Sequence, residues 1–341
     1  MSFKIGITAD FLNEEGQIGW GDIGLSLLTE YPDIEWDFLP DYGDEIPPEA
    51  ANEWDALLVL APRITAATVA GAQRLKIVAR FGVGYDNVDV AACTSAGIAV
   101  TITPDSVRRP VAVATIALIL AMMHNIVNKD GLTRRGLWQE KLRYMGTGVT
   151  GKTLGIIGLG NIGQEVVRVS RSLGFEYLAH DPYPSSRPDP SLEVPYVGLE
   201  ELLRTSDIVC ITARLTDQTR HLIGAREIAM MKPDAYLVNM GRGPIVDEIA
   251  LVDALKRNSI RGAALDVFEQ EPPDPDNPLF KLENVTLTPH AVSWTDESAI
   301  GNGRSALQSI IDIARGRVPA GILNPRVLLT EQPSSSITSK E

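Results

Sequence analysis

The chain has 341 residues, 44% hydrophobic and 22% charged, which is long enough for about two domains with buried cores. Its formal net charge of −13 argues against a nucleic-acid-binding surface, which requires clustered Lys and Arg. The two cysteines, Cys93 and Cys210, lie in apolar stretches. This argues against a disulfide framework and favours buried thiols in a reducing cytoplasm.

In chain order, the first hundred residues contain short apolar or β-branched runs separated by segments with helical spacing. The expected strands are 4–10, 34–40, 56–62, 77–83 and 98–104. Alternating strands and helices are typical of a parallel sheet covered by helices. The N-terminus shows a strand pattern at once, without the basic segment and apolar run of a secretory leader.

An apolar run from Val111 to Met123 follows, too short to span a bilayer and better suited to a buried core helix. After a polar stretch the alternation resumes, with expected strands at 153–159, 176–181, 207–213, 235–240, 262–268 and 284–289. Residues 291–315 have helical spacing, and 331–341 are expected to be disordered. The pattern predicts an α/β fold with two doubly wound parallel sheets.

The segment GIIGLGNIG, residues 155–163, places three glycines between an apolar strand and an amphipathic helix. In that context G-x-G-x-x-G predicts dinucleotide binding, whereas an isolated match can be an ordinary turn. Gly158 would permit the tight turn, Gly160 the approach of a pyrophosphate, and Gly163 close packing of helix and strand. The first amides of the helix, at Asn161 and Ile162, would meet the phosphates.

The second strand of this unit ends at Asp181, at about the spacing of 20 residues expected of the ribose-binding acid. A carboxylate there accepts hydrogen bonds from the adenosine ribose and repels a 2′-phosphate. The sequence therefore favours NAD as the cofactor over NADP. No metal site is expected.

The segment NMGRGPIVDE, residues 239–248, places Arg242 between two glycines after a strand. Taken alone, this could be a solvated loop arginine. In a doubly wound sheet, however, ligands bind beyond the carboxyl ends of the strands. Because a guanidinium fork matches a carboxylate, we expect Arg242 to bind the acid group of a small substrate beside the nicotinamide.

The next two strand ends carry acids and a histidine: Asp266, Glu269 and Glu271 at one, His290 at the other. Hydride transfer between an alcohol and NAD requires a group that exchanges the hydroxyl proton, and histidine titrates near neutral pH. A histidine after Thr-Pro can also be an ordinary loop residue or cap. Its place at a strand end of the cofactor sheet favours a catalytic role.

From about residue 3 to 327 the chain resembles the D-2-hydroxyacid dehydrogenases. The motifs that carry the resemblance are RFGVGYDNVD (80–89), GIIGLGNIG (155–163), HDPY (180–183), NMGRGPIVDE (239–248), GAALDVFEQEP (262–272) and TPHAVSW (288–294). The resemblance implies that the catalytic residues are Arg242, Glu271 and His290. It places Asp266 at the nicotinamide carboxamide and the amides of Val83 and Gly84 at the substrate carboxylate. Thr212 is a further candidate for cofactor binding, and Trp294 is a further candidate for substrate binding.

The resemblance also implies a domain organisation. A discontinuous flavodoxin-like substrate domain would comprise residues 1–103 and 291–330. A Rossmann NAD-binding domain, residues 104–290, would be inserted in it, with an arm at about 122–150 that forms a homodimer. The active site would lie in a cleft closed by hinge motion.

Two segments depart from the family pattern. Arg108 and Arg109 precede the long helix, where members show Val-Ala-Glu a few residues further on. The pair could be solvated hinge residues bonded to Asp105, or could bind a second anionic group of the substrate. Residues 212–216 replace the usual His-x-Pro-Leu-Thr, and Arg214 within them could soften the preference for NAD.

We therefore expect an NAD-dependent enzyme that interconverts a D-2-hydroxy acid and its 2-oxo acid, with no nucleic-acid or membrane partner. A non-catalytic NAD-sensing protein of the same fold is the alternative from another class, as in the C-terminal binding protein co-repressors. Enzymes of the same superfamily with other substrates are a further alternative: hydroxypyruvate or glyoxylate, phosphoglycerate, formate or phosphite. We do not expect a phosphoglycerate dehydrogenase of the long type, because no residues remain for its C-terminal regulatory domain, whereas a short type stays open.

Overall fold

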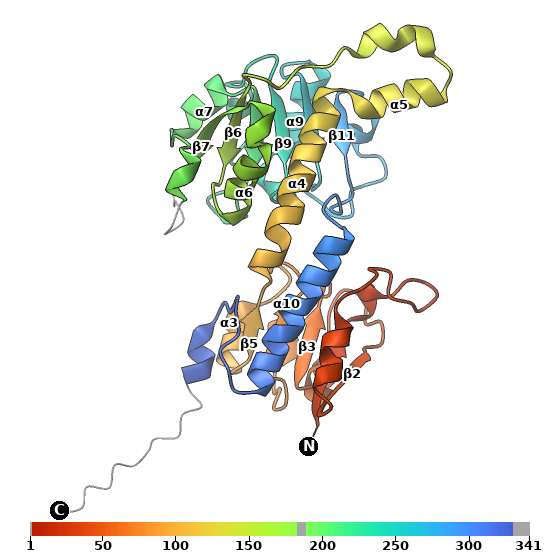
Figure 1. Cartoon of the computed structure of the whole chain (residues 1–341), viewed down its shortest axis with the longest axis vertical. Helices are drawn as coiled ribbons and strands as arrows, with labels where there is room; N and C mark the ends of the chain where they lie inside the picture. Colours follow the sequence, from red (N-terminus) through yellow and green to blue (C-terminus); the bar gives the residue numbers. More distant parts are fainter. Residues whose placement is uncertain (1, 183–188, 330–341) are drawn as a thin grey trace, which may run out of the picture. The chain divides into compact units, whose positions relative to one another are not determined.

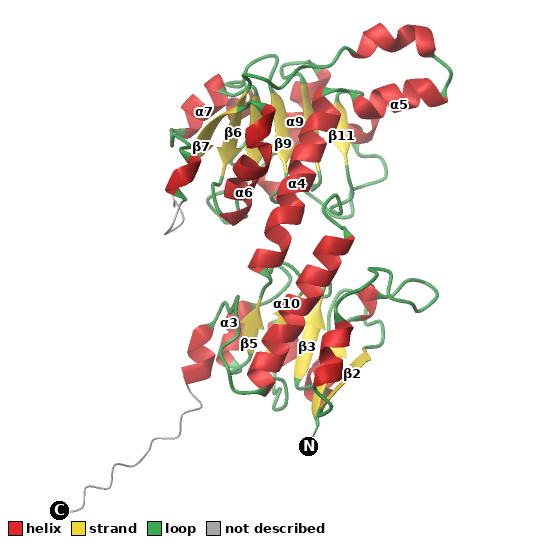
Figure 2. Ribbon diagram, in the orientation of Figure 1, coloured by secondary structure: helices red, strands yellow, loops and turns green. Residues whose placement is uncertain are grey.

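The computed structural model describes residues 2–182 and 189–329, which divide into two compact units (Figures 1 and 2). The first unit comprises the chain up to Val107 together with the segment from Trp294 onward, and the second runs from Arg108 to Ser293. The tail expected to be disordered, 331–341, lies outside the described residues, as does Tyr183 of the HDPY motif.

The first unit contains a parallel sheet in the order β2-β1-β3-β4-β5. Its strands are β1 (Phe3–Ile7), β2 (Ile34–Phe38), β3 (Ala56–Val59), β4 (Ile77–Arg80) and β5 (Ala99–Thr101). One face packs against α10 (Asp296–Ala314) and the other against α2 (Ala66–Val69) and α3 (Val90–Ser95), with α1 (Pro48–Glu53) beside them. This strand order confirms the flavodoxin-like fold that the resemblance implied.

The second unit contains a parallel sheet in the order β11-β10-β9-β8-β6-β7. Its strands are β6 (Thr153–Ile157), β7 (Glu176–His180), β8 (Ile208–Ile211), β9 (Tyr236–Asn239), β10 (Gly262–Leu265) and β11 (Val285–Leu287). β7 lies on one side of β6 and β8 on the other, so the strand order reverses at the carboxyl end of β6. Ligands bind at such a switch point in open α/β sheets.

Helices cover both faces of this second sheet. α4 (Pro104–Met123) and α6 (Asn161–Ser170) pack on one face, and α7 (Leu199–Thr205), α8 (Ala225–Ile228) and α9 (Glu248–Lys256) on the other (Figure 1). By length and composition alone, α4 could cross a membrane, but 56% of its apolar 18-residue stretch is buried in the protein. Ile119 and Met123 are fully buried, as the sequence predicts for a core helix. The helix begins at Pro104 rather than at 111, so Arg108 and Arg109, which were expected before it, lie within it.

Each expected strand segment contains a strand, and the observed strands are shorter because turns begin at their polar or glycine ends. β6 ends at Ile157 because Gly158 has a φ of 92°. The final helix begins at Asp296 rather than 291, because the Thr295 hydroxyl accepts a hydrogen bond from the Ser298 amide and caps it. α5 (Ile126–Arg134) and the 3₁₀ helix η3 (Trp138–Tyr144) project from the second unit (Figure 1).

Candidate active site

The glycine turn after β6 leaves room at one point only among its three glycines. A Cβ on Gly158 would lie 2.6 Å from the Ala213 Cα, and one on Gly163 would lie 2.6 Å from the Gly158 carbonyl oxygen. A Cβ on Gly160 would meet nothing within 4 Å. Thr212 holds the turn, because its hydroxyl donates to the Gly158 carbonyl at 2.7 Å. The open space at Gly160 is where the motif predicts a pyrophosphate.

The N-terminus of α6 fits that anion. Gly160 is its N-cap and has no side chain with which to cap the helix. The first N–H groups of a helix, here including those of Asn161 and Ile162, have no partner within the helix, and the helix dipole favours negative charge there. Asp181 follows β7 directly and is partly exposed at the same edge of the sheet. These residues fit a dinucleotide.

Arg242 lies on a tight turn directly after β9. Asn239, which is 1% exposed, accepts a hydrogen bond from the Gly241 amide at 3.1 Å and donates to the Arg242 carbonyl at 3.0 Å. A Cβ on Gly243 would lie 1.7 Å from the Phe268 carbonyl oxygen, so the turn directly contacts the loop after β10. Asn239 was not among the functional residues expected from the sequence. A buried amide that ends an apolar strand is the signal that could have found it.

His290 and Glu271 form a hydrogen-bonded couple. The Nδ1 atom of His290 lies 2.7 Å from Oε2 of Glu271, and the Phe268 amide donates to Oε1 at 3.0 Å. An ionised carboxylate only accepts hydrogen bonds, so Nδ1 carries the proton and Nε2 is left for a substrate. The His290 side chain is partly exposed, and its backbone adopts a left-handed φ of 53°.

The environment keeps Glu271 ionised. Burial raises the pKa of its carboxyl, but the hydrogen bonds from His290 and Phe268, with the charges of His290 and Arg242, outweigh burial. The pKa of Glu271 is therefore lowered from its ordinary value of 4.5. The carboxylate is charged throughout the neutral pH range.

Asp266 holds the loop that carries His290. It is 5% exposed, and one of its carboxylate oxygens accepts hydrogen bonds from the Thr288 hydroxyl and the amides of Ala291 and Val292, at 2.7, 3.1 and 3.2 Å. Three bonds from residues on both sides of His290 restrict how that loop moves. Contact between Asp266 and the nicotinamide carboxamide stays a prediction.

In the first unit, the residues after β4 offer two backbone donors. Among the residues that the structure describes, the N–H groups of Val83 and Gly84 donate to no carbonyl or side chain. Both residues are partly exposed. Free neighbouring amides suit a carboxylate, as the resemblance implies.

Trp294 belongs to an aromatic cluster in the first unit. Its ring centroid lies 4.0 Å from that of Trp20, which in turn contacts Phe81 at 5.2 Å and Phe11 at 6.3 Å. Trp20 was not among the residues expected from the sequence, because an isolated tryptophan in a loop gives no periodic signal. Whether Trp294 contacts the substrate stays a prediction.

Arg108 and Arg109 lie against Glu165 of α6, inside the second unit. Their closest nitrogens are 3.8 and 3.3 Å from the nearly buried Glu165 carboxylate, which Arg168 also contacts at 3.1 Å. Glu165 thus gives both arginines a partner within the protein. Contact of either arginine with a substrate stays a prediction. Arg214 is exposed, and its effect on cofactor preference likewise stays a prediction.

A histidine poised to exchange a proton, on the same sheet edge as a dinucleotide-binding turn, defines the class: an NAD-dependent oxidoreductase of the Rossmann type. Residues 116–292 match the model of the D-isomer specific 2-hydroxyacid dehydrogenase NAD binding domain. A glyoxylate reductase of Aeropyrum pernix is 41% identical over 317 residues, which cover 91% of this chain and 95% of the relative. The chain therefore belongs to the D-isomer-specific 2-hydroxyacid dehydrogenase family.

Two further matches agree with the family. A D-3-phosphoglycerate dehydrogenase of Methanocaldococcus jannaschii is 41% identical over 278 residues, which cover 81% of this chain and 53% of the relative. The crystal structure of a Thermus thermophilus protein superimposes with a TM-score of 0.82 at 30% identity, covering 94% of this chain and 100% of that one. The expected family, fold class and NAD-dependent activity on 2-hydroxy and 2-oxo acids are confirmed.

Proposed function

We propose that this enzyme reduces glyoxylate with NADH. The observation that carries the proposal is the match to a glyoxylate reductase over nearly the whole of both chains, around an intact His290–Glu271 couple. The phosphoglycerate dehydrogenase is matched over about half its length. The proposal therefore selects one substrate within the family's class of small 2-oxo acids.

In the proposed mechanism, the turn at Gly158, Gly160 and Gly163 and the carboxylate of Asp181 would hold NADH, which would supply the hydride for reduction of the substrate carbonyl. His290 donates the proton on Nε2 to the carbonyl oxygen, which becomes the hydroxyl of the product, and Glu271 stabilises the imidazolium before the transfer. In the reverse direction Nε2 takes that proton back. Arg242 binds the substrate carboxylate through its guanidinium fork.

A panel of 2-oxo acids tests the substrate. We expect the highest kcat/KM for glyoxylate when NADH oxidation is compared with hydroxypyruvate, 3-phosphohydroxypyruvate, pyruvate and 2-oxoisocaproate. Formate and phosphite with NAD are expected to give no reduction of the cofactor. A higher kcat/KM for the phosphorylated acid would contradict glyoxylate as the substrate and favour a phosphoglycerate dehydrogenase activity.

Cofactor choice depends, in this proposal, on Asp181. We expect a higher kcat/KM with NADH than with NADPH, because a carboxylate at the end of β7 repels a 2′-phosphate. Asp181→Ser combined with Pro182→Arg should relax that ratio. Glu176→Ser, at the exposed opposite end of β7, removes one negative charge from the same strand and should leave it unchanged. Equal wild-type constants for the two cofactors would contradict the assignment.

Glu271→Gln is expected to shift the pH profile of reductive kcat/KM toward lower pH. A carboxylate 2.7 Å from Nδ1 favours the doubly protonated imidazole that donates the proton, and a neutral amide does not. Because the pKa of Glu271 is lowered from 4.5, the wild-type carboxylate loses its charge only below about pH 4.5. Profiles measured from about pH 5 to 8 therefore isolate this effect. Coincident wild-type and variant profiles would refute it.

We also propose that the enzyme is a homodimer formed by its projecting arm, α5 and η3. The arm exposes large apolar side chains: Ile126, Val127, Leu137, Trp138, Leu142 and Met145. Trp138 is 62% exposed and Leu142 is 75% exposed. Large apolar side chains gathered on a projecting segment mark a surface that another protein chain covers.

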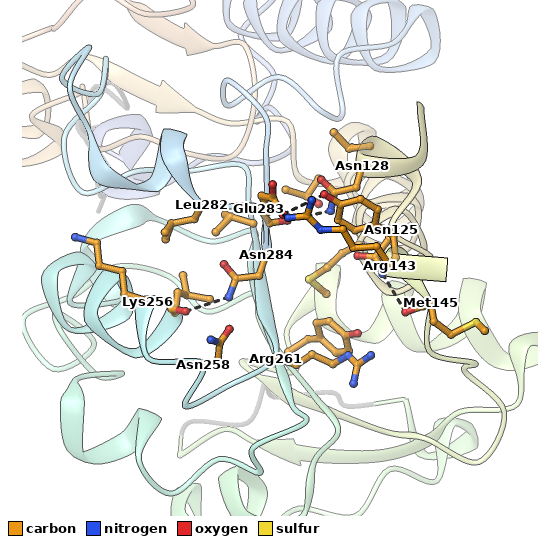
Figure 3. Close-up of a pocket in the computed structure, with 17 residues that line it drawn as sticks. Asn125, Asn128, Arg143, Met145, Lys256, Asn258, Arg261, Leu282, Glu283 and Asn284 are labelled. Carbon is orange, nitrogen blue, oxygen red and sulfur yellow. Dashed lines mark hydrogen bonds and ion pairs between the residues drawn. The ribbon is translucent and has the colours of Figure 1, made fainter. Parts of the chain in front are cut away.

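A groove of about 530 Å³ lies at the base of this arm (Figure 3). One wall carries Asn128 and Arg143, and the other carries Glu283 and Asn284 just before β11. Arg143 and Asn128 bond Glu283 at 2.9 Å each, so the arm is tied to the body of the unit and presents a preformed surface.

Light scattering tests the dimer. Trp138→Glu with Leu142→Glu should shift the mass from dimer to monomer, because both charges would lie in the proposed interface. Ile249→Glu, at a residue 83% exposed outside the arm, should remain dimeric. A monomeric wild-type protein would contradict the proposal.

We place the enzyme in the cytoplasm, without a nucleic-acid or membrane partner. Cys93 and Cys210 are free and buried, and burial raises the pKa of each thiol to about 12. Inert reduced thiols suit a reducing compartment. The net charge of −13 and the buried face of α4 support the absence of the two partner classes.

A further inference from the structure

A second histidine–carboxylate couple lies beside the catalytic one. The Nε2 atom of His221 is 2.6 Å from Oε1 of Glu269, two residues before Glu271. Both side chains are partly exposed. His221 adopts a left-handed φ of 50°, which aims its side chain from a tight turn. The proposed mechanism does not use this couple.

Glu269 also ties its loop to the start of α9. Its second carboxylate oxygen accepts a hydrogen bond from the Glu248 amide at 3.2 Å, and the Glu248 carboxylate accepts one from the Glu269 amide at 3.0 Å. Asn277 donates to the remaining oxygen of Glu248 at 2.7 Å. The loop after β10 is thereby fastened at the residue next to Phe268, whose amide holds Glu271.

The backbone of His221 binds the turn that carries Arg242. Its amide donates to the Pro244 carbonyl at 2.8 Å, and the Ile223 amide donates to the Ile245 carbonyl at 3.1 Å. His221 therefore reaches the Arg242 turn through its backbone and the Glu271 loop through its side chain. Gly243 and Phe268 are in contact between these two attachments.

We infer that His221 and Glu269 are positioning residues for the reaction, holding Arg242 and the Glu271–His290 couple in one arrangement. The inference rests on the proposed catalytic roles of those three residues. A partly exposed ion pair contributes little to the stability of the fold. A displacement of about 1 Å at a catalytic group, by contrast, can cost about 10²-fold in rate. Loss of the couple should therefore lower activity far more than stability.

Two single variants test the couple. His221→Asn keeps a residue that tolerates the left-handed backbone but whose side chain is too short to reach Glu269. Glu269→Ala removes the acceptor. With glyoxylate, each should lower kcat by about 10-fold or more, while the Kd for NADH stays within about twofold and Tm changes little. The His221–Glu269 contact is lost in both variants, and Glu269→Ala also removes the acceptor of the Glu248 amide, so the double variant should lose no more kcat than Glu269→Ala alone.

The controls separate positioning from a merely structural role. Glu269→Gln keeps an acceptor oxygen for His221 and should recover part of the kcat that Glu269→Ala loses. Glu200→Ala removes a comparable exposed ion pair with Arg226 in the same unit and should leave kcat unchanged. A wild-type kcat in both His221→Asn and Glu269→Ala would overturn the inference. So would losses of kcat that only follow losses of folded protein or of NADH affinity.

One further variant, His290→Gln, distinguishes failure of the positioning role from failure of the proposed catalytic assignment. If His290→Gln is inactive while the His221 and Glu269 variants are fully active, the positioning role alone fails. If His290→Gln retains wild-type activity, the proposed catalytic assignment fails, and the positioning role fails with it.

Discussion

His290→Gln is expected to lower kcat for 2-oxo acid reduction by about 10² to 10⁴-fold, the range typical for removal of a general acid–base. Glutamine retains a hydrogen-bonding side chain of similar reach but has no proton to exchange near neutral pH. Its amide can still meet Glu271, so the loop that Asp266 anchors should keep its place. The Kd for NADH should be close to that of the wild type.

Steady-state kinetics together with fluorescence titration of NADH check this expectation. His124→Gln, at an exposed histidine just after α4, is the matched control and should be fully active. The variant has no side chain at this position that titrates near neutral pH, and water must donate the proton instead. Residual activity should therefore depend weakly on pH between about 5 and 8. Retention of wild-type kcat by His290→Gln would remove His290 from the mechanism.

Arg242→Gln is expected to lower kcat/KM for the 2-oxo acid by about 10² to 10³-fold, comparable to loss of a donor aimed at developing charge. Most of the effect should fall on KM, because the guanidinium binds the carboxylate before and during hydride transfer. Arg242→Lys keeps the charge without the planar fork. Its kcat/KM should therefore lie between those of Arg242→Gln and the wild type.

Asn239 makes this experiment interpretable, because it bonds the backbone on both sides of the arginine rather than the guanidinium. The substitution removes the hydrogen bond from Arg242 Nη1 to the Gly241 carbonyl at 2.8 Å, but both Asn239 bonds remain, so Tm should change little. Arg257→Gln, which removes an exposed i,i+4 partner of Asp253 in the same unit, is the control for charge. An unchanged KM for the acid in Arg242→Gln would show that Arg242 is not its carboxylate site.

Local pattern was enough to predict the strands and the dinucleotide turn. The central strands of both sheets are buried on two faces, so each is a short apolar run that can be recognised in the sequence, whereas the edge strand β2, IEWDF, is largely exposed. Each glycine of the turn answers a local requirement: Gly158 a positive φ, and Gly163 close contact with the Gly158 carbonyl. Requirements confined to one strand–turn–helix segment are readable in the sequence that forms it.

Partners that come from distant segments required the tertiary structure. Arg108 and Arg109 read equally well as partners of Asp105 or of a substrate, and only the packing of α4 beside α6 brings them to Glu165. In the sequence, Asn239 has no distinguishing feature. Only the structure shows that the turn after β9 is hydrogen-bonded to its side chain. Neither contact follows from spacing, because neither depends on helix or strand periodicity.

The acids after β10 show the division most clearly. By itself the sequence determined that Asp266, Glu269 and Glu271 follow one strand of a cofactor sheet and that a histidine follows the next, but it left the three carboxylates nearly equivalent. In the tertiary structure Asp266 is hydrogen-bonded to the His290 loop, Glu269 to His221 and Glu271 to His290. The physical reason is that a strand end directs successive side chains to different neighbours, and those neighbours are brought there by the order of strands in the sheet.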